Sequence, residues 1–200
     1  MQISDEQLKA LLDNRVKLYN QVDFIAADPI TIPHQFSKKQ DIEIAGLFAA
    51  VLAWGNRKSI INSCNKLLTW MDNDPHAFIL HHTEHDLKKM LQFAHRTFNA
   101  TDLLYFIERL HLHYVQYDSL ESMFISPNIE QEADVCNALI HFHNAFFSID
   151  HPHRTKKHLA SPAKKSACKR INMYLRWMVR KDAAGAVSYT HLTLPTNREV

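Results

Sequence analysis

Apolar side chains recur along most of the chain at the three-to-four-residue spacing of amphipathic helices. Pro, Gly and Asn interrupt this pattern at intervals that suit helix ends. The expected helices run from Ser4 to about Tyr19, Asp41–Trp54, Arg57–Met71, from Pro75, from Thr101 to about Tyr114, Glu130–Ile149 and Lys164–Val179. No segment alternates with the two-residue period of a half-buried strand. The pattern therefore predicts an all-α, multi-helix bundle.

Two of these helices have patterns that indicate their places in the bundle. The segment Ile42–Trp54 is apolar on nearly every side, which is typical of a central helix buried all round. The last helix is apolar on one side only, and its predicted inward stripe is Ile171, Tyr174, Leu175 and Met178. We expect both helices to contribute to one core.

The last 18 residues, AAGAVSYTHLTLPTNREV, have no helical period and no continuity with the segment before them. They resemble the translation of a sequencing adapter. We therefore expect a helical domain at residues 1–182 that is incomplete at its C-terminal end, followed by a tail at 183–200 that is not native.

Charge is distributed very unevenly. Residues 151–181 hold ten Lys or Arg and no Asp or Glu, whereas residues 1–150 hold 12 basic and 19 acidic side chains. The overall charge of +2 conceals this division. A concentrated positive charge beside Trp, Tyr and Met favours a phosphate backbone as partner, DNA above all. The cations expected to bind it are Arg154, Lys156, Lys157, Lys164, Lys165, Arg170 and Arg176.

Composition argues against several other classes of protein. The apolar run from Ile44 to Trp54 is too short to span a membrane, and Cys64, Cys136 and Cys168 are too far apart to form a CxxC motif. We expect reduced thiols, a cytoplasmic location and no cofactor. Only three Gly are present, and neither a GxxxxGK loop nor a dinucleotide-binding fingerprint occurs. The oligomeric state is left open.

Lys169 stands near the start of the last helix among other cations. A lysine crowded by like charges and partly desolvated loses its proton more easily, and a neutral amine forms Schiff bases. The alternative is a solvated lysine that binds phosphate.

Trp177 lies on the same predicted face as Arg170, where it would stack a base or wedge into a duplex. The alternative for Trp177 is packing against a neighbouring helix.

A corner between two helices, Trp54-Gly55-Asn56-Arg57, offers Asn56 and Arg57 to a nucleic-acid groove, or else forms an ordinary polar helix end.

The many histidines also raise the possibility of a metal site. The HxH pairs at His111 and His141 lie on helices, where residues two apart point in opposite directions and cannot chelate one ion. His85-Asp86 imitates the dyad of metal-dependent phosphohydrolases, and such a site would also need ligands such as His34, His81 and Asp118.

Three segments carry a resemblance to a known family. They are DIEIAGLFAAVLAWGNRKSI, HRTFNATDLLYFIERL and RTKKHLASPAKKSACKRINMYLRWMVRKD. They resemble an uncharacterised conserved bacterial family, across essentially residues 1–182. That family is in turn remotely similar to the helix-hairpin-helix DNA glycosylases, in particular the archaeal 8-oxoguanine type.

The resemblance implies roles for a few residues. Ile42–Trp54 would be the first core helix of a glycosylase, and Asn56 would stand near the residues that fill the gap left by a flipped base. Lys169 would be the catalytic lysine that attacks C1′ of the flipped nucleotide. The assisting Asp would lie beyond the native part of this chain, so the fragment itself is expected to be inactive.

Three hypotheses therefore stand. The protein is a DNA-repair enzyme of the glycosylase and lyase type that binds duplex, damaged DNA and uses Lys169. Alternatively, it is a non-catalytic module that binds DNA or RNA. The third hypothesis is a metal-dependent phosphohydrolase that uses His85 and Asp86.

Overall fold

In the computed structural model, the described residues are 3–19, 21–125, 134–180 and 189. The chain is all-α apart from one two-stranded hairpin, as the hydrophobic pattern predicts. The helices are α1 (Asp5–Tyr19), α2 (Lys39–Leu52), α3 (Arg57–Trp70), α4 (Pro75–His81), α5 (Glu84–Met90), α6 (Ala100–Tyr114), α7 (Cys136–Phe146) and α8 (Lys169–Val179). The hairpin is β1 (Ala94–His95) with β2 (Phe98–Asn99).

Short 3-10 helices fill several connections. They span Val22–Ala27, Pro29–Thr31, Pro33–Gln35, Leu120–Met123, His153–His158 and Pro162–Lys164. The hairpin was not predicted because strands of two residues are too short to show an alternating pattern. No described helix combines the length and the apolar character needed to cross a lipid bilayer.

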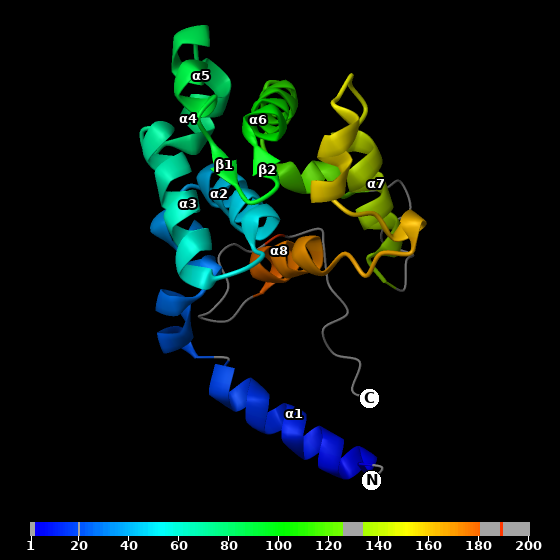
Figure 1. Cartoon of the computed structure of the whole chain (residues 1–200). Helices are drawn as coiled ribbons and strands as arrows, with labels where there is room; N and C mark the ends of the chain where they lie inside the picture. Colours follow the sequence, from blue (N-terminus) through cyan, green and yellow to red (C-terminus); the bar gives the residue numbers. More distant parts are fainter. Residues whose placement is uncertain (1–2, 20, 126–133, 181–188, 190–200) are drawn as a thin grey trace.

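Helix α2 lies at the centre of the fold, as its sequence predicts (Figure 1). Every residue from Asp41 to Leu52 is buried, and α2 packs against α3, α4 and α8. Its two buried carboxylates are satisfied by hydrogen bonds. Glu43 accepts from the Tyr114 hydroxyl at 2.8 Å and from the Ser119 hydroxyl at 2.6 Å. Polar groups inside the core thereby tie α2 to the segment after α6.

Helix α8 lies across α2 in the lower middle of Figure 1, and its inward stripe is the predicted one. Ile171, Tyr174, Leu175 and Met178 are all buried. The helix begins at Lys169, however, and not at Lys164. Lys165 and Cys168 take left-handed backbone conformations, with φ of 58° and 49°, and these interrupt the helix.

Two further helices differ from expectation. Helix α7 begins at Cys136 and ends at Phe146, and residues 130–133 of its predicted start lie outside the described part. Helix α1 extends away from the other helices (Figure 1), and its apolar residues Leu8, Leu11 and Val16 are 44–57% exposed.

The domain boundary expected at residue 182 also lies outside the described residues. Tyr189, beyond that boundary, is buried, and its hydroxyl lies 2.8 Å from that of Tyr174.

The crossing of α2 and α8 leaves no room for a side chain at Gly46. A Cβ at this position would lie 2.9 Å from Met178 Cε and 3.4 Å from Tyr174. We predict that Gly46→Val lowers the free energy of unfolding by about 1–3 kcal/mol, because an added branched side chain overpacks the contact. Urea denaturation measures this loss.

Combining Gly46→Val with Met178→Ala provides the control for this prediction. The shorter residue removes the clash, so the double variant should lose less than the two single variants together. Strict additivity of the two losses would contradict a direct contact between these positions.

Candidate nucleic-acid interface

The segment between α7 and α8 is fixed to the body of the protein by Asp102. This residue occupies the first turn of α6, is fully buried, and accepts a hydrogen bond from the Asn99 N–H at 3.0 Å. Its Oδ1 accepts a hydrogen bond from the Thr155 hydroxyl at 2.8 Å. Its Oδ2 lies 3.4 Å from the Arg154 guanidinium and 3.2 Å from His158 Nε2. One carboxylate therefore anchors three residues of the cationic segment.

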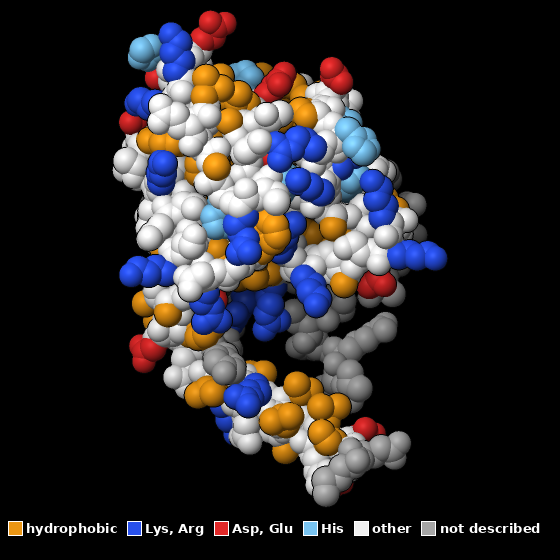
Figure 2. All heavy atoms as spheres, in the orientation of Figure 1, with side chains coloured by type: hydrophobic (Ala, Val, Ile, Leu, Met, Phe, Trp, Pro, Cys, Tyr) orange, Lys and Arg blue, Asp and Glu red, His pale blue; other side chains and the backbone are white. Residues whose placement is uncertain are grey.

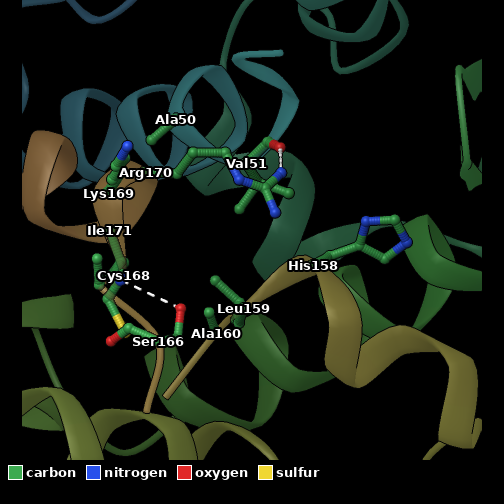
Figure 3. A pocket seen from close by; sticks show the side chains of 11 residues that line it. Ala50, Val51, His158, Leu159, Ala160, Ser166, Cys168, Lys169, Arg170 and Ile171 are labelled. Atoms are coloured by element: carbon green, nitrogen blue, oxygen red, sulfur yellow. Dashed lines mark hydrogen bonds between the residues drawn. The ribbon is translucent and has the colours of Figure 1, made fainter. Parts of the chain in front are cut away.

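Next to this anchor lies a cavity of about 290 Å³, which we call the Lys169 pocket. Figure 3 shows it between the end of α2, the start of α8 and the chain that precedes α8. Its walls combine apolar side chains with a few polar ones. It is lined by Ala50, Val51, His158, Leu159, Ala160, Ser166, Ala167, Cys168, Lys169, Arg170 and Ile171.

A second hollow, which we call the cationic groove, adjoins the pocket. It measures about 430 Å³ and shares Leu159, Ala160 and Ser166 with the Lys169 pocket. It is lined by these three residues and by His143, His153, Arg154, Lys156, Lys157, Ser161 and Lys164. Pocket and groove together present six Lys or Arg side chains, and none of the described residues lining them is acidic.

The space-filling view shows the same division of charge (Figure 2). Lys and Arg side chains spread over the middle of this face, whereas the visible Asp and Glu side chains lie toward its margins. Within the described part of the chain, Arg154 is the only cation lining the two hollows with a carboxylate within 4.0 Å. The face therefore keeps most of its positive charge.

Arg170 is one of these cations without a nearby carboxylate, and it is partly desolvated. It is half-buried and donates a hydrogen bond to the Val51 carbonyl at the end of α2. Burial lowers the pKa of its guanidinium, because desolvation disfavours the charged form. A carbonyl supplies only partial compensation for a full charge. Arg170 is therefore well suited to an anionic ligand, which would supply the missing charge.

The neighbouring titratable groups respond to the same environment. Burial lowers the pKa of His158 most strongly, and Lys157 and Arg170 lower it further, although Asp102 acts in the opposite direction. Burial also lowers the pKa of His143, with contributions from Lys164 and Lys156. Both imidazoles are therefore held neutral at pH 7. Burial raises the pKa of the Cys168 thiol, which makes this cysteine an unreactive thiol.

The turn before α8 satisfies much of its own backbone. Lys165 follows a 3-10 helix and is left-handed, and the N–H groups of Lys164 and Lys165 donate to the carbonyls of Ser161 and Pro162. Cys168, the N-cap of α8, makes no side-chain capping hydrogen bond. The positive end of the α8 dipole thus opens at Lys169. Lys169 itself is exposed, so the desolvation expected from the sequence is not present.

The other predicted residues are placed differently. Trp177 is 5% exposed, so the prediction that it stacks on a base is wrong. The apolar stripe of α8 is wider than four residues, and Trp177 forms one edge of it. Arg176 is exposed two turns beyond Lys169, and Lys165 is exposed in the turn.

Asn56 and Arg57 line a separate hollow of about 630 Å³ at the corner between α2 and α3. Asn56 caps α3 by accepting from the Ser59 N–H, and Arg57 lies 3.7 Å from Asp28 and over the ring of Phe24. Both side chains therefore already have partners within the protein. Sequence reasoning missed Arg96 and Lys58, which lie near the same corner: Arg96 is distant in the sequence, and Lys58, although adjacent to Arg57, was not included with it.

The metal site that the third hypothesis requires does not assemble among the described residues. No three His, Cys, Asp or Glu side chains come together there in a group suited to a metal ion. His85 is exposed on α5 and Asp86 is half-buried there, and Asp86 completes a capping box with Thr83. A hydrogen-bonding role in a helix cap accounts for Asp86.

Comparison with known proteins gives a family and nothing further. The model of a family described as "Protein of unknown function (DUF2400)" matches residues 28–193, so the chain belongs to this family. No curated protein matches, and no solved structure matches. The expected uncharacterised family is confirmed.

We predict that Asp102→Ala destabilises the fold by about 1–3 kcal/mol, because it leaves the buried Thr155 hydroxyl and the Asn99 N–H without their acceptor. Urea denaturation is the measurement. Asp86→Ala is the matched control, since Asp86 occupies the corresponding position of α5 at a less buried site. Equal losses for the two variants would show that Asp102 acts only as a helix cap.

Proposed function

For this member of the DUF2400 family, we propose that the protein binds DNA through the Lys169 pocket and the cationic groove. The observation that carries the proposal is the joined pair of hollows, with six Lys or Arg side chains and no acidic residue among the described residues that line it. A polyanion is the partner class that such a surface selects. The reduced thiols and this partner also favour the cytoplasm.

The energetics support a nucleic acid over a small anion. Cations packed together repel one another, and this repulsion opposes folding unless a ligand offsets it. Phosphates spaced along a backbone reach several of these side chains at once, and each contact releases a condensed counterion. The start of α8 at Lys169 adds the positive end of a helix dipole beside the Lys169 pocket.

We predict that Lys156→Ala combined with Lys157→Ala weakens binding to a labelled 20-base-pair duplex. It should also flatten the plot of log K against log salt by up to about 1.8, because each lost phosphate contact removes about 0.9 from the slope. Fluorescence anisotropy at several salt concentrations measures both effects.

The control is Lys88→Ala combined with Lys89→Ala, another adjacent lysine pair, exposed on α5. This variant carries the same change in net charge and should retain the wild-type slope. Equal effects of the two double variants would contradict a localised interface. A wild-type slope near zero would remove the proposal as a whole.

A second candidate function adds chemistry at Lys169. This lysine lines a cavity with apolar walls, close to the lower end of the roughly 300–1,000 Å³ of small-molecule sites. An amine beside bound DNA forms a Schiff base with the C1′ aldehyde of an abasic nucleotide, with loss of water. The resemblance to helix-hairpin-helix glycosylases points to the same residue. The protein would then be a DNA glycosylase or lyase that acts on damaged duplex.

Trapping with borohydride separates catalysis from binding alone. We predict that wild-type protein and an abasic duplex give a covalent adduct even without the assisting Asp, because the imine needs only the Lys169 amine and the abasic aldehyde, and borohydride reduces it to a stable amine. Lys169→Ala should abolish the adduct, whereas Lys164→Ala should retain it and only weaken binding. Denaturing electrophoresis detects the adduct. If no adduct forms, and both variants lose affinity equally, the protein is a binding module without lyase chemistry.

A further inference from the structure

Trp54 and Arg96 form an exposed stacked pair at the corner between α2 and α3. The Arg96 guanidinium carbon lies 4.9 Å from the centre of the Trp54 ring. Trp54 remains 38% exposed even with Arg96 over its ring. Trp70 is half-buried and Trp177 is buried, so Trp54 is the most exposed of the three tryptophans.

The pair is held in place by the backbone on both sides. Arg96 stands in the turn between β1 and β2 with φ of 57°, a conformation that non-glycine residues rarely take. Gly55 has φ of 104°, and a Cβ there would lie 2.2 Å from Arg96 Nη1. Arg96 therefore packs directly on the Gly55 backbone. Such close packing fixes the ring before any ligand arrives, which lowers the entropic cost of binding.

Along the chain, Trp54 also stands between residues that line two separate hollows. Trp54 follows Ala50 and Val51, which line the Lys169 pocket, and precedes the Asn56 corner hollow. On the other side, the carbonyl of Thr97, next to Arg96, accepts a hydrogen bond from Arg154 at 2.8 Å. A nucleic acid lying along the cationic groove would therefore pass beside the Trp54 ring.

Comparison with the other exposed aromatic side chain supports a specific role. Among the described residues, Trp54 and Tyr117 are the aromatic side chains more than a third exposed. Tyr117 stacks on His113 and precedes Asp118, in a part of the chain where acidic residues predominate. Trp54 instead is followed by Arg57 and Lys58 and lies under Arg96. Only Trp54 combines an exposed ring with surrounding positive charge.

We infer that Trp54, supported by Arg96, is a stacking platform for one unpaired nucleobase of the bound nucleic acid. The inference rests on the proposed function and narrows its substrate class to DNA with a locally unpaired base. An aromatic ring accepts any base, because every base has a π face, but only a base outside a duplex exposes that face. The surface therefore distinguishes opened from fully paired DNA.

The test compares two labelled duplexes, one fully paired and one with a central bulge of three thymines. Wild-type protein should bind the bulged duplex more tightly, and the bulge should quench tryptophan fluorescence. Trp54→Ala should weaken binding to the bulge by roughly 5- to 100-fold, the range typical of losing one base–aromatic stack. It should leave binding to the paired duplex nearly unchanged. Trp54→Phe should retain most of the preference, and Tyr117→Ala is the matched control.

The outcomes distinguish failure of the proposed DNA binding from failure of the Trp54 stacking platform. If wild-type protein binds neither duplex at low salt, the proposed function fails. If it binds both equally, and Trp54→Ala changes neither affinity, DNA binding stands and the platform is refuted. Equal weakening of both duplexes by Trp54→Ala would also refute stacking, because a general contact would then explain the loss. Circular dichroism and thermal unfolding of each variant verify that the fold is retained.

Discussion

The buried carboxylate of Asp102 is the constraint on which the candidate interface depends. The segment after α7 has neither a helix nor a strand long enough to hold it against the core, and it carries a strong positive charge that resists compaction. Asp102 compensates by contacting Arg154, Thr155 and His158 from a fully buried position in the first turn of α6. Because the same carboxylate caps α6 through the Asn99 N–H, helix formation and docking of the segment are coupled. A single interaction thus converts a flexible basic connection into an ordered wall of the Lys169 pocket.

The buried position of Asp102 also explains why the other cations of the segment keep their charge. Asp102 neutralises Arg154 and is too deeply buried to serve the lysines that follow it in the chain. Lys156, Lys157 and Lys164 extend into the cationic groove, and their charges remain uncompensated by carboxylates of the described residues. The acidic side chains of the front portion are used elsewhere: Asp41 and Glu43 inside the core, and Asp74 and Asp86 at helix ends. The protein therefore separates its charges by function, with carboxylates that stabilise the fold and cations that stay available at the surface.

Sequence patterns predicted the helical architecture well and the site only in part. The central position of α2 and the inward stripe of α8 could be predicted because an apolar face of regular period must be buried. The cluster of Arg154, Lys156, Lys157 and Lys164 could be predicted because these residues are close in sequence. Trp177 was misassigned, since its period fits either edge of the apolar stripe and only packing decides between them. His158 and Arg96 were missed, because their importance arises from contacts with Asp102 and Trp54 that are distant in sequence.

The turn before α8 takes left-handed conformations without glycine. Glycine is the usual residue at such positions, because it has no Cβ. This chain has no glycine there and places Lys165 and Cys168 in that conformation instead. Each such residue costs of order 1–3 kcal/mol, which the surrounding structure must supply. The hydroxyl of Ser166 accepts the Cys168 N–H at 3.2 Å, and burial of Cys168 in the core adds to this support. At Lys165 the side chain also places a positive charge at the surface, which a glycine would not supply.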